Sequence, residues 1–129
     1  MTIAVAHFDS DRGRAALRYA AEEAQFRQQP LVVLRIIGGV DEVTEVDSSV
    51  LETVNAELAD YADVNWTLRT APERFDTAES LLDLAEEVEA SLLVIGSRQR
   101  TRVGKLLLGS TVQRVLLEAH LPVLVVKTT

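Results

Sequence analysis

The chain has no cysteine, and only two of its 129 residues are histidine. The absence of cysteine excludes disulfide bonds, thiolate catalysis and cysteine-based zinc sites. His7 and His120 are far apart in the sequence and belong to no metal-binding motif. We therefore predict no metal site and assign no catalytic residue.

Long apolar runs are also missing. A membrane-spanning helix needs roughly 20 consecutive apolar residues, and no segment comes near that length. The N-terminal segment lacks the basic stretch of a signal peptide. The formal net charge of −7 argues against general nucleic-acid binding, because phosphates are bound through clustered basic side chains. We expect one cytoplasmic domain over residues 1–129, with neither a membrane nor a nucleic acid as partner.

Short apolar segments alternate with longer amphipathic ones. The apolar segments predict strands over residues 3–7, 31–37, 64–70, 92–95 and 123–127. Helical periodicity predicts helices over residues 12–28, 47–61, 77–90 and 110–119, with an irregular acidic loop over 38–49. Nearly all-apolar strands separated by helices are typical of a parallel sheet that is covered on both faces. We predict a doubly wound, Rossmann-like α/β domain with five parallel strands in the order 3-2-1-4-5.

A basic segment follows the fourth predicted strand. Four basic residues lie within 98–105, between Gly96 and the helix that begins at Ser110. Ligands of open α/β sheets bind at the carboxyl ends of the strands, and the amino end of a helix favours anions. This combination predicts a phosphate site. In the alternative interpretation, Ser110 and Gln113 form a capping box and the basic segment is a solvated loop.

Four segments resemble the universal stress protein family. They are RAALRYAAEEA, LVVLRII, AESLLDLAEEVEASLLVIGS and KLLLGSTVQRVLLEAHLPVLVVK, and the resemblance extends over essentially the whole chain. It implies a stress-response domain with the fold of the adenine nucleotide alpha hydrolases. Many members of the family form homodimers through their final strands, and a subset binds ATP or AMP. The resemblance therefore implies a dimer interface at Val123, Val125 and Lys127.

The ATP-binding members share a glycine signature that this chain matches in part. The signature consists of glycine, two residues, glycine, nine residues, and then glycine with serine or threonine. Gly96 and Gly109 match it with the nine-residue spacing, but Gln99 replaces the second glycine, and Phe8 stands where those members have an aspartate that contacts adenosine. The resemblance also places the backbone of Ile36 at the adenine. The nucleotide-site residues that it implies are Phe8, Ile36, Gly96, Arg98, Gln99, Gly109, Ser110 and Thr111.

Three functions are therefore open at this point. The first is a non-enzymatic sensor that binds ATP or AMP, with Mg²⁺ in the case of ATP. The second is a dimeric protein-interaction module that binds no ligand, because Phe8 and Gln99 close its cleft. The third is a weak nucleotide hydrolase, for which Asp9 and Asp11 are the candidate carboxylates.

Overall fold

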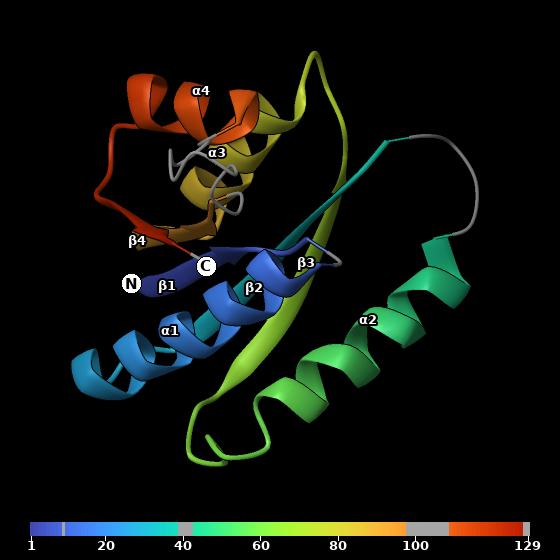
Figure 1. Ribbon diagram of the computed structural model, residues 1–129, viewed down its shortest axis with the longest axis vertical. Coiled ribbons are helices and arrows are strands. Elements are labelled where there is room, and N and C mark those ends of the chain that lie inside the picture. The colour runs from blue at the N-terminus through green and yellow to red at the C-terminus, as the bar shows by residue number, and fades with distance from the viewer. Residues whose placement is uncertain (9, 39–42, 98–108, 128–129) are drawn as a thin grey trace, which may run out of the picture.

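The computed structural model describes residues 1–8, 10–38, 43–97 and 109–127. Five parallel strands form one sheet in the order β3-β2-β1-β4-β5, and four helices connect them (Figure 1). This order confirms the predicted fold class. The elements are β1 (Thr2–Ala6), α1 (Asp11–Arg27), β2 (Leu31–Ile37), α2 (Val43–Glu57), β3 (Trp66–Pro72), α3 (Thr77–Glu87), β4 (Ala90–Gly96), α4 (Ser110–Glu118) and β5 (Val123–Val126).

Alternate residues of each strand enter two separate cores. In β1, Ile3 and Val5 pack on the side of α1 and α2, whereas Ala4 and Ala6 pack on the side of α3 and α4. The strands β2 and β4 divide their side chains in the same way. Because both faces of the sheet are covered, the inner strands have no polar face, which explains their nearly all-apolar sequences.

Side-chain caps fix where two of the helices begin. The hydroxyl of Ser10 accepts a hydrogen bond from the backbone N–H of Gly13 at 3.3 Å, and this contact begins α1. The carboxylate of Asp76 accepts one from the N–H of Glu79 at 2.8 Å and begins α3. Both residues are of the types that favour the N-cap position. Asp11, a candidate carboxylate of the hydrolase hypothesis, lies within α1 and forms an ion pair with Arg14.

The irregular loop predicted over residues 38–49 is wrong in its second half, which belongs to helix α2. Helix α2 begins at Val43, four residues before the predicted start, and it ends at Glu57 instead of Tyr61. The last two residues of the predicted apolar stripe, Leu58 and Tyr61, still pack on the core, but they do so from the turn that follows α2. Periodicity therefore identified the buried face correctly and misplaced the ends of the helix.

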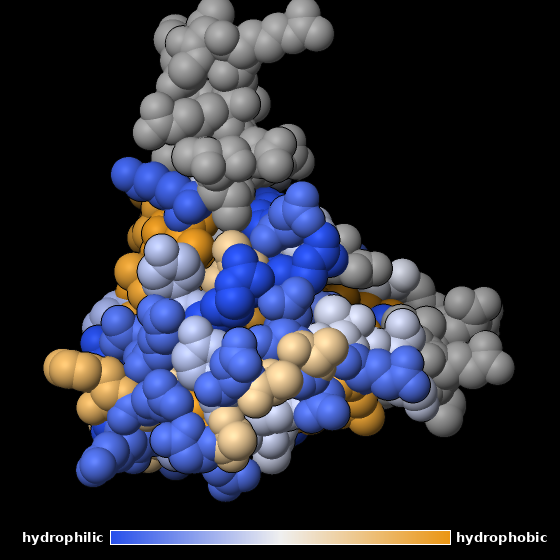
Figure 2. Space-filling view, turned by 60° about the horizontal axis from the view of Figure 1, so that its bottom comes forward, coloured by the Kyte–Doolittle hydropathy of each residue, from blue (hydrophilic) through white to orange (hydrophobic). Residues whose placement is uncertain are grey.

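The molecular face shown in Figure 2 is largely hydrophilic, with apolar side chains in small separate areas. Within the described residues, no helix is both long and apolar enough to cross a membrane. Trp66 is half-buried against the core on the α1 side of the sheet, which agrees with a packing role.

Candidate functional site

The described residues of the predicted nucleotide site gather at the carboxyl edge of the sheet. Phe8 lies just after β1, Ile36 lies near the end of β2, and Gly96 ends β4. Because α4 runs back toward the start of β5, its first residues also lie at this edge (Figure 1). Phe8 and Ile36 both pack against the core that α3 and α4 cover. Arg98 and Gln99 lie outside the described residues.

Gly96 allows helix α1 to pack closely against the end of β4. A Cβ atom at residue 96 would lie 2.4 Å from the carbonyl oxygen of Arg12 and 2.9 Å from its carbonyl carbon. Real Cβ atoms do not approach backbone atoms this closely. The glycine is therefore required by the packing of the protein itself, whether or not a ligand also approaches it.

Gly13 has a similar role, which the sequence analysis missed. A Cβ atom at this position would lie 1.8 Å from the carbonyl oxygen of Phe8. The signal was present in the sequence, because a glycine inside an alanine-rich helix costs about 1 kcal/mol relative to alanine. Such a residue indicates a close backbone contact. Gly13 thus holds the segment that carries Phe8 directly against the first turn of α1.

Phe8 is partly buried by its surroundings. Its half-buried side chain packs against the core beneath α3 and α4, and the guanidinium carbon of Arg12 lies 4.4 Å from the centre of its ring. This distance is within the range of a cation–π interaction. The ring is therefore held in place by contacts with the protein on more than one side.

Helix α4 begins without a side-chain cap. Its N-cap residue is Gly109, with φ of 80° and ψ of 158°, and no side chain of the described residues accepts a hydrogen bond from the first turn. The capping box predicted from Ser110 and Gln113 is therefore absent, because Ser110 is already the first helical residue. The first intrahelical bond runs from the N–H of Gln113 to the carbonyl oxygen of Gly109 at 3.1 Å.

The first turn of α4 has the properties of an anion site. The leading N–H groups of a helix have no partner within the helix, and the helix dipole places partial positive charge there. Ser110 is exposed and Thr111 is half-buried, so two hydroxyl groups accompany these N–H groups. A phosphate or carboxylate oxygen would satisfy the same donors that a capping side chain satisfies elsewhere.

The strand β5 is an edge of the sheet. Within the described sheet it pairs with β4 alone, and Val123 and Val125 are half-buried against the core on the α3 side. The N–H of Leu93 donates to the carbonyl of Pro122, and the N–H of Ser97 donates to that of Val126. The even-numbered residues of β5 therefore direct their backbone N–H and C=O groups toward β4. Those of Val123 and Val125 point the opposite way, out from the edge of the sheet. Lys127 follows the strand and is exposed.

The described residues hold no cluster of three or more histidine or acidic side chains placed to bind a metal ion. His7 directly follows β1, and its backbone N–H donates to the carbonyl of Leu34 at 2.8 Å, which prolongs the pairing with β2. Asp9 lies outside the described residues.

The comparisons with known proteins agree with this fold. The universal stress protein family model matches residues 1–127. A universal stress protein of Mycolicibacterium smegmatis is 43% identical over 117 residues, which cover 89% of this chain and 88% of that protein. Three mycobacterial relatives at 31% identity are longer, and the chain spans about half (47%) of their length.

Two solved structures have the same architecture. The universal stress protein from Archaeoglobus fulgidus has a TM-score of 0.78 and 32% sequence identity, with 97% of both chains covered. A structure of the universal stress protein from the same organism in complex with dAMP has a TM-score of 0.72 and 29% identity, with 97% of this chain and 96% of that chain covered. The chain therefore belongs to the universal stress protein family.

Proposed function

We propose that the protein binds an adenine nucleotide at the carboxyl edge of the sheet and acts as a non-enzymatic nucleotide sensor in a stress response. The observation that carries this proposal is the uncapped start of α4 at Gly109. A monophosphate bound there would accept hydrogen bonds from the leading N–H groups and from the hydroxyls of Ser110 and Thr111. The base would then lie toward Ile36, at the end of β2.

The comparisons support the same ligand class. A relative with 29% identity has been solved in complex with dAMP, which combines an adenine base with one phosphate. The basic residues Arg98, Arg100 and Arg102 would add charge beside the phosphate, in a chain that is otherwise acidic. We infer that AMP or ATP is the natural ligand, with Mg²⁺ accompanying ATP.

The proposal is tested by native mass spectrometry and isothermal titration calorimetry with AMP, dAMP and ATP, each with and without Mg²⁺. We expect saturable binding of one nucleotide per chain. Inorganic phosphate and guanosine monophosphate serve as controls for the anion and the base. A protein that binds none of the adenine nucleotides would disprove the proposal.

A second function is favoured by the partly buried position of Phe8. Phe8 packs against the core and lies under the guanidinium group of Arg12. The family resemblance implies that ATP-binding members have an aspartate at this position. Together with Gln99, Phe8 would close the cleft, and the domain would then recognise a protein partner without a nucleotide. A Phe8→Asp/Gln99→Gly variant separates the two functions. If only the variant binds AMP, the natural cleft is closed, as the interaction-module function requires.

We further propose that two copies pair through β5. The outward N–H and C=O groups of Val123 and Val125 form an unpaired edge, and such an edge is satisfied when a second strand pairs with it. A proline at residue 125 would remove one outward N–H without disturbing the bonds to β4, because those involve the even-numbered residues.

The Val125→Pro variant tests this pairing by sedimentation velocity. We expect the native protein to sediment as a dimer and the variant as a monomer. Val125→Thr is the matched control, because it keeps both the β-branched shape and the N–H group. A dimer that survives the proline would place the interface elsewhere.

A further inference from the structure

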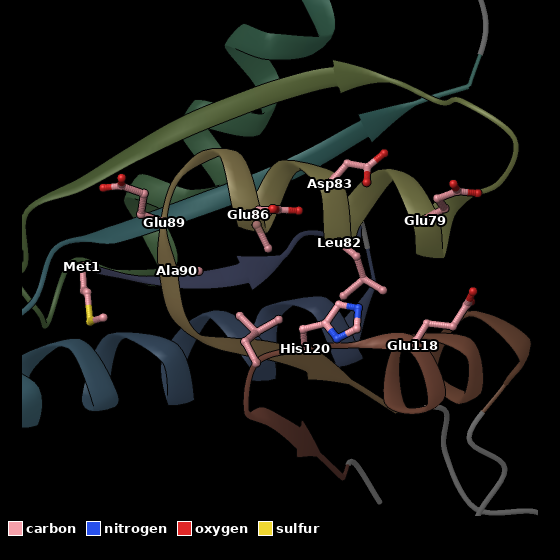
Figure 3. Close-up of a pocket in the computed structure, with 11 residues that line it drawn as sticks. Met1, Glu79, Leu82, Asp83, Glu86, Glu89, Ala90, Glu118 and His120 are labelled. Atoms are coloured by element: carbon pink, nitrogen blue, oxygen red, sulfur yellow. The ribbon is translucent and has the colours of Figure 1, made fainter.

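A groove lies between α3 and α4, on the face of the sheet that these helices cover (Figure 3). Its volume is about 870 Å³. Five apolar residues contribute to its lining: Met1, Leu82, Ala85, Ala90 and Leu121. Among the described residues, it shares none with the predicted nucleotide site, so it requires an explanation of its own.

The side of the groove formed by α3 is strongly acidic. Glu79, Asp83 and Glu86 line it at spacings of four and three residues, and Glu89 extends the row beyond the end of α3 (Figure 3). Residues at these spacings are neighbours on one face of a helix. Like charges placed in this way repel one another and weaken the isolated helix. The row therefore carries an electrostatic cost.

Several acidic residues elsewhere on the helices are paired. Glu23 forms an ion pair with Arg27 at 3.0 Å, Glu57 with Arg18 at 2.9 Å, and Glu87, at the end of α3, with Arg69 at 3.4 Å. Within the part of the chain that the structure describes, no lysine or arginine pairs with the four carboxylates of the row.

Among the described residues, the opposite side of the groove adds no lysine or arginine to the lining. Glu118 and His120 lie there, across from the row (Figure 3). Arg114 is already engaged, because it pairs with Glu118 at 2.9 Å and also with Asp76. The N-terminal residue Met1, with its single ammonium group, also lines the groove, so the four carboxylates of the row leave an excess of negative charge beside an apolar lining.

We propose that this groove docks a basic amphipathic segment of a partner protein. Apolar side chains of that segment would cover Leu82 and Leu121, while its lysine or arginine side chains would pair with the row on α3. Charge complementarity selects this occupant, because an acidic or purely apolar segment would leave the four carboxylates unpaired and partly desolvated.

The test uses a fluorescein-labelled synthetic helix with lysine on one face and leucine on the other. The same helix with glutamate in place of lysine is the control peptide. Fluorescence anisotropy gives the affinity, and the methyl resonances of Leu82 and Leu121 locate the bound peptide. We expect the lysine peptide to bind with shifts at these methyl groups and the glutamate peptide not to bind.

Two charge variants distinguish the groove from general attraction to an acidic protein. Asp83→Asn/Glu86→Gln removes two charges of the row, and Glu52→Gln/Asp60→Asn removes two exposed charges on and after α2. The loss of two surface ion pairs should weaken binding about fivefold in the first variant, whereas the second should bind like the native protein. Equal weakening in both, or no binding by the native protein, would overturn the proposal. A groove that instead takes a second copy would be revealed by a change of oligomeric state in the first variant alone, which also overturns it.

Discussion

The carbonyl oxygen of Arg12 occupies the space that a Cβ atom of residue 96 would need. The Cβ atom and the carbonyl oxygen would be 2.4 Å apart, so α1 and β4 can pack this closely only because residue 96 has no side chain. The guanidinium group of the same Arg12 lies over the ring of Phe8. One residue therefore links the glycine that ends β4 to the aromatic side chain that follows β1.

Gly96→Ala should destabilise the protein in the absence of any ligand. A methyl group forced into a filled space typically costs about 1–3 kcal/mol, because the backbone of α1 has to shift. Urea denaturation of the nucleotide-free protein measures this loss. Gly38→Ala is the matched control, because its Cβ would lie 3.2 Å from a carboxylate oxygen of the Glu73 side chain, which can move. Unchanged stability in Gly96→Ala would show that the glycine is kept for a ligand instead.

The two glycines of the predicted signature show what the sequence could and could not predict. Composition and periodicity were sufficient for the covered parallel sheet, because nearly all-apolar strands separated by helices are typical of that architecture. They were not sufficient to separate a packing glycine from a ligand glycine. That distinction depends on the carbonyl of Arg12, which is 84 residues away from Gly96 in the chain.

The starts of α1 and α3 were predicted to within one residue, because Ser10 and Asp76 have recognisable capping chemistry. Helix α4 also begins at the predicted residue, Ser110, but its N-cap residue is Gly109, so the position was correct and the predicted capping box was wrong. The start of α2 carried no clear capping pattern at residue 42, and acidic residues nearby were mistaken for a loop.

Phe75→Gly should stabilise the protein. Phe75 has φ of 62°, and its side chain is 91% exposed, so the left-handed backbone is strained while the ring contributes little packing. A non-glycine residue in this conformation is strained by roughly 1–2 kcal/mol. Glycine removes that strain but loses more chain entropy on folding, so only part of the strain energy appears as added stability. We expect a gain of about 0.5–1 kcal/mol in the free energy of unfolding.

The control for this effect is Phe75→Ala, which removes the ring but keeps the Cβ atom that causes the strain. Its stability should stay near that of the native protein. If alanine and glycine stabilise the chain equally, the exposed ring was the unfavourable element and the backbone was not.

The stability that Tyr61 contributes should be lost in alkali, when its phenol group ionises. Burial, and secondarily the hydrogen bond that its hydroxyl donates to Glu22 at 3.2 Å, raise the pKa of this phenol above 10.0. The unfolded chain therefore releases the proton first as the pH rises. Its contribution to stability is complete below the unfolded pKa of about 10 and is lost as the pH rises toward the higher folded pKa.

The measurement compares urea midpoints of Tyr61→Phe and the native protein from neutral pH to above pH ~10. The variant should lose less stability over that range, because it has no phenol to ionise. Tyr19→Phe is the control, since that side chain is 52% exposed. Parallel curves for Tyr61→Phe and the native protein would contradict the assignment.

A carboxylate at residue 110 should have opposite effects on stability and on nucleotide binding. Ser110→Asp places a negative charge in the first turn of α4, where it complements the helix dipole and should add about 0.3–1 kcal/mol of stability. The same charge repels a phosphate and competes with it for the leading N–H groups of α4. The affinity for AMP should therefore fall by about tenfold or more, as expected when like charges meet at a binding site.

Asn55→Asp on the exposed side of α2 is the control, because it adds an equal charge elsewhere and should leave the affinity unchanged. If Ser110→Asp gains stability and still binds AMP as tightly as the native protein, the phosphate does not lie at this helix, and the anion site at α4 has to be given up.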